Sequence, residues 1–166
     1  MASFRRAFFS FHYTRDAWRA AQVRGVAILP NIKTTGRFSD NAAWETVKRQ
    51  SDGAIKRWID EQLNGVSVTV VLIGQETASR RWVQYEIAES VRRGKGLLGV
   101  RIHNIESFSG PLRTVDRSGP DPFAAVSDPF QPNKTLKSQF PIYQWKPNGR
   151  QNLADWIEKA AQAAGR

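Results

Sequence analysis

One segment near the middle of the chain limits the fold more than any other. Residues 66–73 read VSVTVVLI, a run that is rich in β-branched residues and apolar at most positions. A strand with one buried face alternates apolar and polar residues, whereas a strand covered on both faces does not. The run therefore predicts a central strand of a parallel sheet, with helices on both sides.

Strands and helices alternate along the chain around this run. Four further apolar runs predict strands at residues 7–11, 26–29, 97–102 and 141–145. Apolar residues at helical spacing predict helices at about 14–25, from 44, at 51–64, at 79–92 and from 152. This alternation predicts an α/β fold with a doubly wound, mostly parallel five-stranded sheet.

Capping residues and turn residues set the expected ends of these elements. Thr14 is the expected N-cap of the first helix, and Gly25 can end that helix. Pro30 closes the second strand, and the polar residues 31–41 are expected to form a long loop. Ser51 or Asp52 is the expected cap of the helix at 51–64, and Asn152 is that of the last helix.

The alternation stops between residues 107 and 139, where five of the eight prolines lie. A loop ordered by packing and a flexible insertion both fit this composition. A chain of 166 residues is expected to form one domain. We therefore expect a single domain over residues 1–166, with a Pro/Gly-rich loop or insertion at about 107–139.

Composition excludes several kinds of site. The chain has no cysteine, which excludes disulfides and thiolate chemistry, and its two histidines do not favour a metal centre. No apolar run approaches the roughly 20 residues that span a bilayer, and the N-terminus is a poor signal peptide. We therefore expect a cytoplasmic protein. Its net charge of +10 would speed encounters with any anion, including nucleic acid and NAD⁺.

Familiar catalytic motifs are missing at the positions where they would act. No G-x-G-x-x-G follows an expected strand, and the sequence has neither G-x-x-x-x-G-K-[ST] nor G-x-S-x-G. A receiver domain would need acidic residues after the first strand and a phosphoacceptor Asp after the third. The chain has Ser-Phe-His-Tyr and Gly-Gln there, so this class is excluded.

Ligands of open parallel sheets bind beyond the carboxyl ends of the strands. The residues to consider are therefore 10–13, 74–77 and 103–104, which follow the first, third and fourth expected strands. These stretches include both histidines of the chain, His12 and His103.

Glu86 is a further candidate, because it lies four residues after Trp82 and so shares one helix face with it. The spacing leaves two interpretations of this carboxylate open. It is either functional or a solvent carboxylate paired with Arg93 or an arginine on the preceding turn. Arg80 and Arg81 are not expected to share the stripe of Trp82 and Glu86.

Several segments of the chain resemble TIR domains. Residues 8–16 (FFSFHYTRD) resemble the first TIR box, and residues 68–74 match the strand before the TIR glutamate helix. Residues 79–86 (SRRWVQYE) resemble the pattern Ser-x-x-Trp-Cys-x-x-Glu, with Val83 in place of Cys. Residues 58–63 (WIDEQL) and 96–105 (GLLGVRIHNI) add to this resemblance. The chain looks most similar to the TIR-like proteins of bacterial Thoeris antiphage defence. The resemblance covers about residues 5–105 and the last strand and helix.

This resemblance implies a flavodoxin-like TIR fold and an enzyme that cleaves NAD⁺. Such enzymes release nicotinamide and close the remaining ADP-ribose into a cyclic ADP-ribose-type signal. The resemblance assigns the catalytic role to Glu86, which would stabilise the ribosyl oxocarbenium ion as nicotinamide departs neutral. NAD⁺ is then the substrate, and neither a cofactor nor a metal is expected.

The same resemblance implies a set of substrate-binding residues. Ser10 and His12 match the first-strand loop that meets the substrate in TIR domains. Asp40 and Trp44 lie in the region of the covering loop, and Asn104 would bond the ribose or the nicotinamide carboxamide. Four aromatic residues are candidates for excluding water during cyclisation: Phe9, Trp44, Trp82 and Tyr85. Aromatic residues in such positions also serve as core.

The resemblance implies partners as well as a substrate. Besides NAD⁺, these are a downstream effector that senses the cyclic product, a phage-derived trigger and further copies in a homo-oligomer. Neither a membrane nor specific nucleic acid is expected. Three other functions stay open: a non-catalytic TIR scaffold, a nucleic-acid-binding module and an N-ribosyltransferase of similar fold. A nucleic-acid module would gather Arg and Lys on one face.

Overall fold

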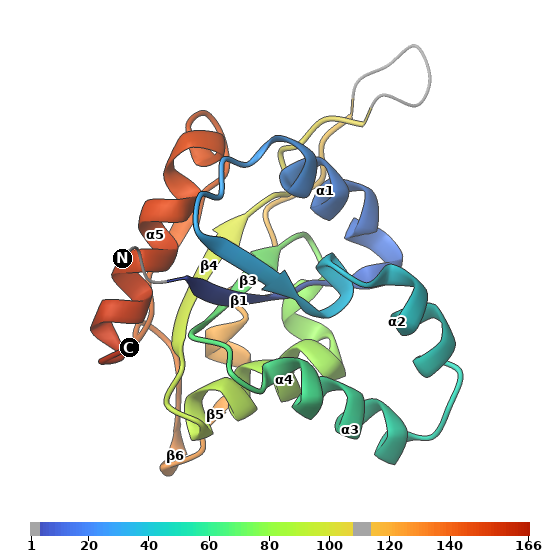
Figure 1. The fold of residues 1–166 in the computed structure, drawn as a ribbon, viewed down its shortest axis with the longest axis vertical. Coiled ribbons are helices and arrows are strands. Elements are labelled where there is room, and N and C mark those ends of the chain that lie inside the picture. Colours follow the sequence, from blue (N-terminus) through green and yellow to red (C-terminus); the bar gives the residue numbers. More distant parts are fainter. Residues whose placement is uncertain (1–3, 108–113) are drawn as a thin grey trace.

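A parallel sheet of five strands forms the centre of the computed structural model, which describes residues 4–107 and 114–166 (Figure 1). The strand order is β2-β1-β3-β4-β7, and every neighbouring pair is parallel. The strands are β1 (Arg5–Ser10), β2 (Ile32–Thr35), β3 (Val68–Ile73), β4 (Gly96–Arg101) and β7 (Ile142–Gln144). The α/β fold and its five-stranded parallel sheet are thus as the sequence predicted.

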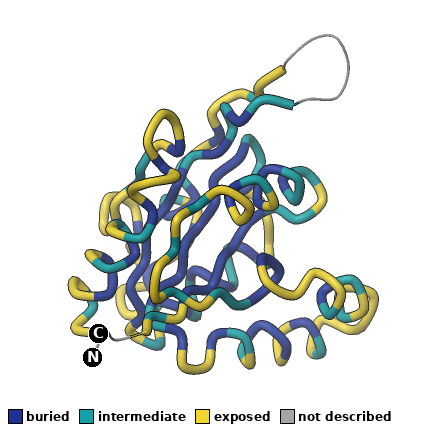
Figure 2. The backbone as a smooth tube through the Cα atoms, turned by 45° about the horizontal axis from the view of Figure 1, so that its top comes forward, coloured by how far each residue is buried: buried dark blue, intermediate teal, exposed yellow. Residues whose placement is uncertain are grey.

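The central position of β3 is confirmed by its burial. All six residues of this strand have no exposed surface. It pairs with β1 on one side and with β4 on the other. Figure 2 shows the sheet as the buried interior, with most exposed positions on helices and loops.

Five helices cover the two faces of the sheet (Figure 1). They are α1 (Tyr13–Val26), α2 (Asn41–Val47), α3 (Asp52–Leu63), α4 (Arg81–Arg92) and α5 (Gly149–Ala163). On one face, Ala20 of α1 and Ile157 of α5 share a hydrophobic cluster with Phe9. On the other face, Ile59 of α3 packs in a cluster with Phe8, and α4 lies beside it. No helix in the described ranges has the length and hydrophobicity to cross a bilayer.

The second strand lies later in the chain than the sequence predicted. Helix α1 continues through Gly25 to Val26, so the strand expected at residues 26–29 does not form. Residues 31–41, expected as a loop, instead contain β2 and a short 3₁₀ helix, η1 (Gly36–Phe38). The prediction was wrong because β2 reads IKTT, a short edge strand whose half-polar sequence has little apolar signal.

The starts of two helices also differ from the expected caps. Helix α1 begins one residue before Thr14, and α5 begins three residues before Asn152, at Gly149. Neither start has a capping hydrogen bond from a side chain, so the capping pattern could not locate it. Ser51 does cap α3 as expected, because its hydroxyl accepts a backbone N–H at 3.2 Å.

The described part of the Pro/Gly-rich stretch packs against the core. It contains a short 3₁₀ helix and an antiparallel pair of strands: η3 (Phe123–Ala125), β5 (Ser127–Asp128) and β6 (Gln131–Thr135). Phe123, Val126 and Leu136 are buried in the cluster on the α4 face of the sheet. Residues 114–139 therefore fit the packed alternative, and residues 108–113 lie outside the described residues.

Close contact between β4 and α5 leads to a test of this packing. A Cβ added at Gly96 would lie 2.7 Å from the carbonyl carbon of Ala160, closer than real Cβ contacts come. We expect Gly96→Ala to lower the free energy of unfolding by about 1–3 kcal/mol, the usual cost of overpacking. Urea denaturation measures this difference.

Gly25→Ala is the matched control, because nothing lies within 4 Å of the added Cβ at that helical position. Alanine favours a helix over glycine by roughly 0.5–1 kcal/mol, so this variant should be as stable as the parent or more stable. Equal losses in both variants would contradict the close contact between β4 and α5.

Candidate functional site

Glu86 lies in the second turn of α4, and its side chain is fully buried. Val83 and Ile87 beside it pack in the core. The carboxylate meets the carboxyl end of β1, where the Ser10 hydroxyl donates to Oε2. The interpretation of Glu86 as a solvent carboxylate paired with Arg93 is wrong, because Arg93 forms its ion pairs with other carboxylates.

Arg37 holds the Glu86 carboxylate with two donors. Its Nη1 donates to Oε1 and its Nη2 donates to Oε2 at 2.9 Å, while Nη2 also donates to the Phe11 carbonyl oxygen at 3.1 Å. The two side chains are 2% and 0% exposed, so this is a buried ion pair. Arg37 could not be singled out from the sequence, because one arginine in a stretch expected to be a loop belongs to no recognisable motif.

Aromatic residues of β1 hold the short helix η1 that positions Arg37. Gly36 has a left-handed φ of 82°, and a Cβ there would come within 2.7 Å of the Phe8 ring. On the other side of Arg37, the Phe38 ring stacks on Phe9 with 3.9 Å between the ring centroids. The close approach of η1 to the strand therefore requires glycine before Arg37.

Burial and charge act on the Glu86 carboxyl in opposite directions. Complete burial raises the pKa of Glu86 above its ordinary value, and the Arg37 guanidinium and the Ser10 hydroxyl act to lower it. The ionised form of Glu86 is therefore stabilised by these two neighbours and not by solvent. Removing one partner of such a pair leaves an uncompensated buried charge, which is strongly destabilising.

A pocket of about 260 Å³ opens beside this ion pair. Three arginines, four aromatic residues and a histidine contribute most of its lining: Arg37, Arg80, Arg81, Phe11, Tyr13, Trp44, Trp82 and His12. Glu86 is not part of the lining. Arg37 lines the pocket and also binds the carboxylate, so it connects the two.

Arg80 and Arg81 lie close to Trp82 in space, although helical spacing did not place them on the stripe of Trp82 and Glu86. Both line the same pocket as Trp82. Arg80 has an extended backbone, with φ −83° and ψ 120°, because it precedes the first helical residue of α4. Rotation by 100° per residue does not apply to such a position. The Arg81 guanidinium lies 4.4 Å from the Trp82 ring centroid, as in a cation–π contact.

Three buried polar atoms around the pocket have no hydrogen-bond partner among the described residues: His12 Nδ1, Arg37 Nε and Trp44 Nε1. His12 Nδ1 lies 3.9 Å from the Glu76 carboxylate, which is too far for a hydrogen bond. Burial and the nearby Arg80 lower the pKa of His12, which favours its neutral form. Buried polar groups in proteins nearly always have partners, so these three atoms are available to water or to a ligand.

Other predicted binding residues lie outside the lining of this pocket. Phe9 is core, and Asp40 is exposed and caps α2 by accepting a backbone N–H at 2.9 Å. The Tyr85 hydroxyl donates to Asp60 at 2.9 Å. Asn104 is half-buried after β4, and its Oδ1 has no partner among the described residues. Contact of these side chains with substrate stays a prediction.

The pocket is chemically suited to an anion. In the part of the chain that the structure describes, no group of three or more His, Asp or Glu side chains could hold a metal ion. The pocket instead offers guanidinium and indole N–H donors. Guanidinium groups match phosphate and carboxylate oxygens in particular.

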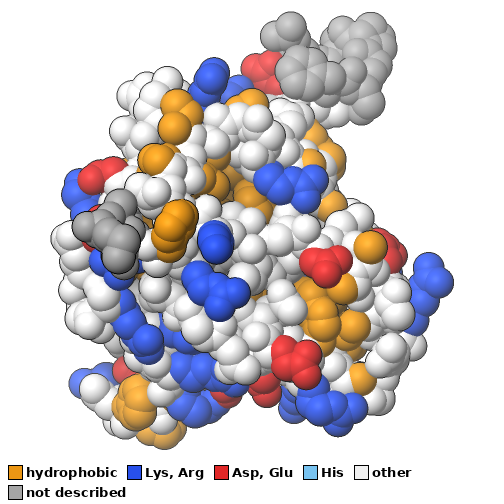
Figure 3. All heavy atoms as spheres, in the orientation of Figure 1, with side chains coloured by type: hydrophobic (Ala, Val, Ile, Leu, Met, Phe, Trp, Pro, Cys, Tyr) orange, Lys and Arg blue, Asp and Glu red, His pale blue; other side chains and the backbone are white. Residues whose placement is uncertain are grey.

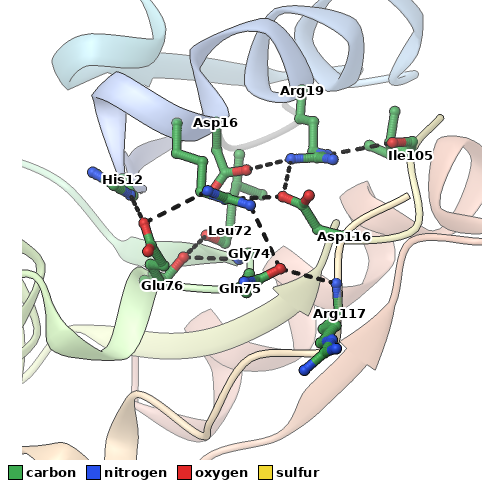
Figure 4. A network of polar contacts seen from close by, with 12 residues as sticks. His12, Asp16, Arg19, Leu72, Gly74, Gln75, Glu76, Ile105, Asp116 and Arg117 are labelled. Atoms are coloured by element: carbon green, nitrogen blue, oxygen red, sulfur yellow. Dashed lines mark hydrogen bonds and ion pairs between the residues drawn. The ribbon is translucent and has the colours of Figure 1, made fainter. Parts of the chain in front are cut away.

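A second polar network lies near the pocket (Figure 4). Arg19 Nη1 donates to the buried Asp16 at 2.9 Å and to Asp116 at 2.8 Å, and Arg15 Nε donates to Asp116 at 3.0 Å. Burial raises the pKa of Asp16. Since Asp116 belongs to the described part of the insertion, this network ties the insertion to α1.

The loop after β3 connects this network to the pocket (Figure 4). The side-chain oxygen of Gln75 accepts the backbone N–H of Arg117 at 3.1 Å. The next residue, Glu76, lies 3.9 Å from His12 Nδ1 and 4.0 Å from Arg80 Nη2, and both of these side chains line the pocket. The insertion is therefore joined to the pocket wall by polar contacts.

Comparison with known proteins identifies the family. A family model described as "Thoeris protein ThsB, TIR-like domain" matches residues 8–107. A protein of Bacillus cereus (strain MSX-D12) named "Putative cyclic ADP-D-ribose synthase ThsB1" is 36% identical over 143 residues, which cover 85% of this chain and 71% of that protein. The chain belongs to the ThsB family of TIR-like Thoeris proteins.

Proposed function

We propose that this protein cleaves NAD⁺, releases nicotinamide and closes the ADP-ribose into a cyclic product. The observation that carries this proposal is the buried Glu86 carboxylate beside a pocket of arginines and aromatic rings. The name of the Bacillus cereus relative supports the same activity.

The chemistry needs few groups from the protein. The bond between the ribose and the nicotinamide nitrogen breaks, and both electrons go to the nitrogen, so nicotinamide leaves neutral without a general acid. The ribosyl oxocarbenium ion that develops is stabilised by a carboxylate placed near it. A hydroxyl of the same molecule then attacks the anomeric carbon, which closes the ring, and the hydroxyl proton is released to solvent. In this scheme Glu86 supplies the carboxylate.

The size of the pocket indicates which part of NAD⁺ it would hold. Ligand pockets commonly measure about 300–1,000 Å³, so 260 Å³ suits one half of a dinucleotide. We place the nicotinamide ribose there, with Phe11, Trp44 and Trp82 excluding water from the reacting carbon.

The distribution of charge favours a small anion over a nucleic acid. On the face drawn in Figure 3, Lys and Arg side chains occur at several places, with acidic and hydrophobic side chains between them. A nucleic-acid interface would concentrate them on one surface. The arginines of the pocket are instead grouped around a concave site.

The wider biological setting is part of the proposal. We propose a role in antiphage defence, in which a downstream effector senses the cyclic product and a phage-derived trigger activates the enzyme. The protein would act in the cytoplasm, as a homo-oligomer, without a bound cofactor. These expectations rest on the family.

Glu86→Gln tests the catalytic assignment. The change preserves size and removes the charge that stabilises the oxocarbenium ion, so NAD⁺ turnover should fall by roughly 100-fold or more. Incubation with NAD⁺ and chromatography of the products measures nicotinamide and the cyclic product. Glu89→Gln, on the same helix but paired with Arg92 and Arg93, is the control and should retain turnover. Full activity in a folded Glu86→Gln variant would favour the non-catalytic scaffold.

The pH dependence of turnover tests the environment of Glu86. Burial raises the pKa of this carboxyl, and only its ionised form can stabilise the cation. We therefore expect kcat/KM for nicotinamide release to fall on the acid side with an apparent pKa above that of an ordinary glutamate. Circular dichroism at each pH separates this effect from acid unfolding. An acid limb at or below the ordinary pKa of glutamate in folded protein would contradict the assignment.

A further inference from the structure

Both oxygens of the Glu86 carboxylate accept hydrogen bonds in the free protein. Oε1 accepts from Arg37, and Oε2 accepts from both Arg37 and Ser10. With the guanidinium on both oxygens, the negative charge is neutralised at short range. A carboxylate that stabilises a cation in the pocket must therefore lose at least one contact with Arg37.

Arg37 is the partner that can leave, because it borders the pocket. Its Nε is buried with no acceptor among the described residues, which leaves one donor unused in the free protein. Its guanidinium carbon lies 4.8 Å from the Trp44 ring centroid and 5.5 Å from that of Phe11. Aromatic faces attract a guanidinium at such distances, so they can hold Arg37 in more than one orientation.

A buried guanidinium that leaves a carboxylate needs another anion. Phosphate groups meet this need best, since their oxygens accept two parallel N–H bonds from one guanidinium. Arg80 and Arg81 line the same pocket and add positive charge where a phosphate would enter.

We propose that Arg37 exchanges partners, from Glu86 in the free protein to a phosphate group of the dinucleotide in the complex. This inference rests on the proposed function. Arg37 is then a binding and positioning residue that couples the arrival of the phosphates to the release of the catalytic carboxylate. A nucleoside without phosphates would leave Glu86 paired with Arg37.

The exchange makes Glu86 and the phosphates competitors for one guanidinium. Coupling between two such interactions is typically 5- to 150-fold in affinity. We therefore expect Glu86→Gln to bind ADP-ribose and inorganic pyrophosphate more tightly than the parent does, by roughly tenfold. Neither probe carries nicotinamide, so isothermal titration calorimetry measures binding without turnover. Adenosine, which has no phosphate, should bind equally to both proteins.

Variants of Arg37, combined with Glu86→Gln, complete a double-mutant cycle. Arg37→Gln should weaken binding of both phosphate probes, and Arg37→Lys should restore part of it by restoring the charge. If Arg37→Gln alone does not fold, the double variant Arg37→Gln/Glu86→Gln removes both buried charges and serves in its place. The double variant should show no gain over the parent, because the gain in Glu86→Gln requires Arg37. Arg92→Gln, at the far end of α4, controls for the loss of one positive charge.

Two results would overturn the exchange. One is a Glu86→Gln variant that binds ADP-ribose no more tightly than the parent, and the other is the same gain in the absence of Arg37. The binding measurements test the exchange, whereas turnover tests the proposed function, so the two can fail separately. Loss of turnover without tighter binding leaves Glu86 catalytic and removes the exchange. Tighter binding with full turnover keeps the exchange of Arg37 and removes Glu86 from the chemistry.

Discussion

The buried pair of Arg37 and Glu86 joins parts of the chain that lie 49 residues apart. Arg37 follows the edge strand β2, Glu86 belongs to α4, and Ser10 brings the end of β1 to the same carboxylate. Moving an ion out of water costs several kcal/mol even after the protein relaxes, so each charge is tolerated only beside the other. The edge strand, its neighbour and the helix on one face are thereby placed relative to one another.

Most of the buried charged side chains described above lie where the strands of the sheet end, at their carboxyl termini. Asp16 and Arg19 are buried with Asp116 beside them, and the Arg37–Glu86 pair is close to the same strand ends. Parallel strands direct their carboxyl ends to one edge, where ligands of this fold class bind. The described part of the insertion reaches this edge through Asp116, so it belongs to the surroundings of the site as well as to the core.

The sequence predicted those features of the fold that depend on local patterns. The run of β3 and the cap of α3 were correct, because continuous apolar residues and a capping serine act within a few positions. The strand β2 was missed because pairing with β1 stabilises it, and a four-residue edge strand carries almost no pattern of its own. Arg37 was missed for a related reason. Its partner is distant in sequence, so no spacing along the chain could connect it to Glu86.

Burial divides the arginines of the pocket into two groups with different responses to ionic strength. The side chain of Arg37 is 2% exposed, whereas those of Arg80 and Arg81 are 44% and 61% exposed. Mobile ions screen exposed charges beyond about 8 Å at physiological salt and affect buried pairs much less. Added salt would therefore slow the arrival of an anionic ligand at the rim, and the inner ion pair would keep its strength.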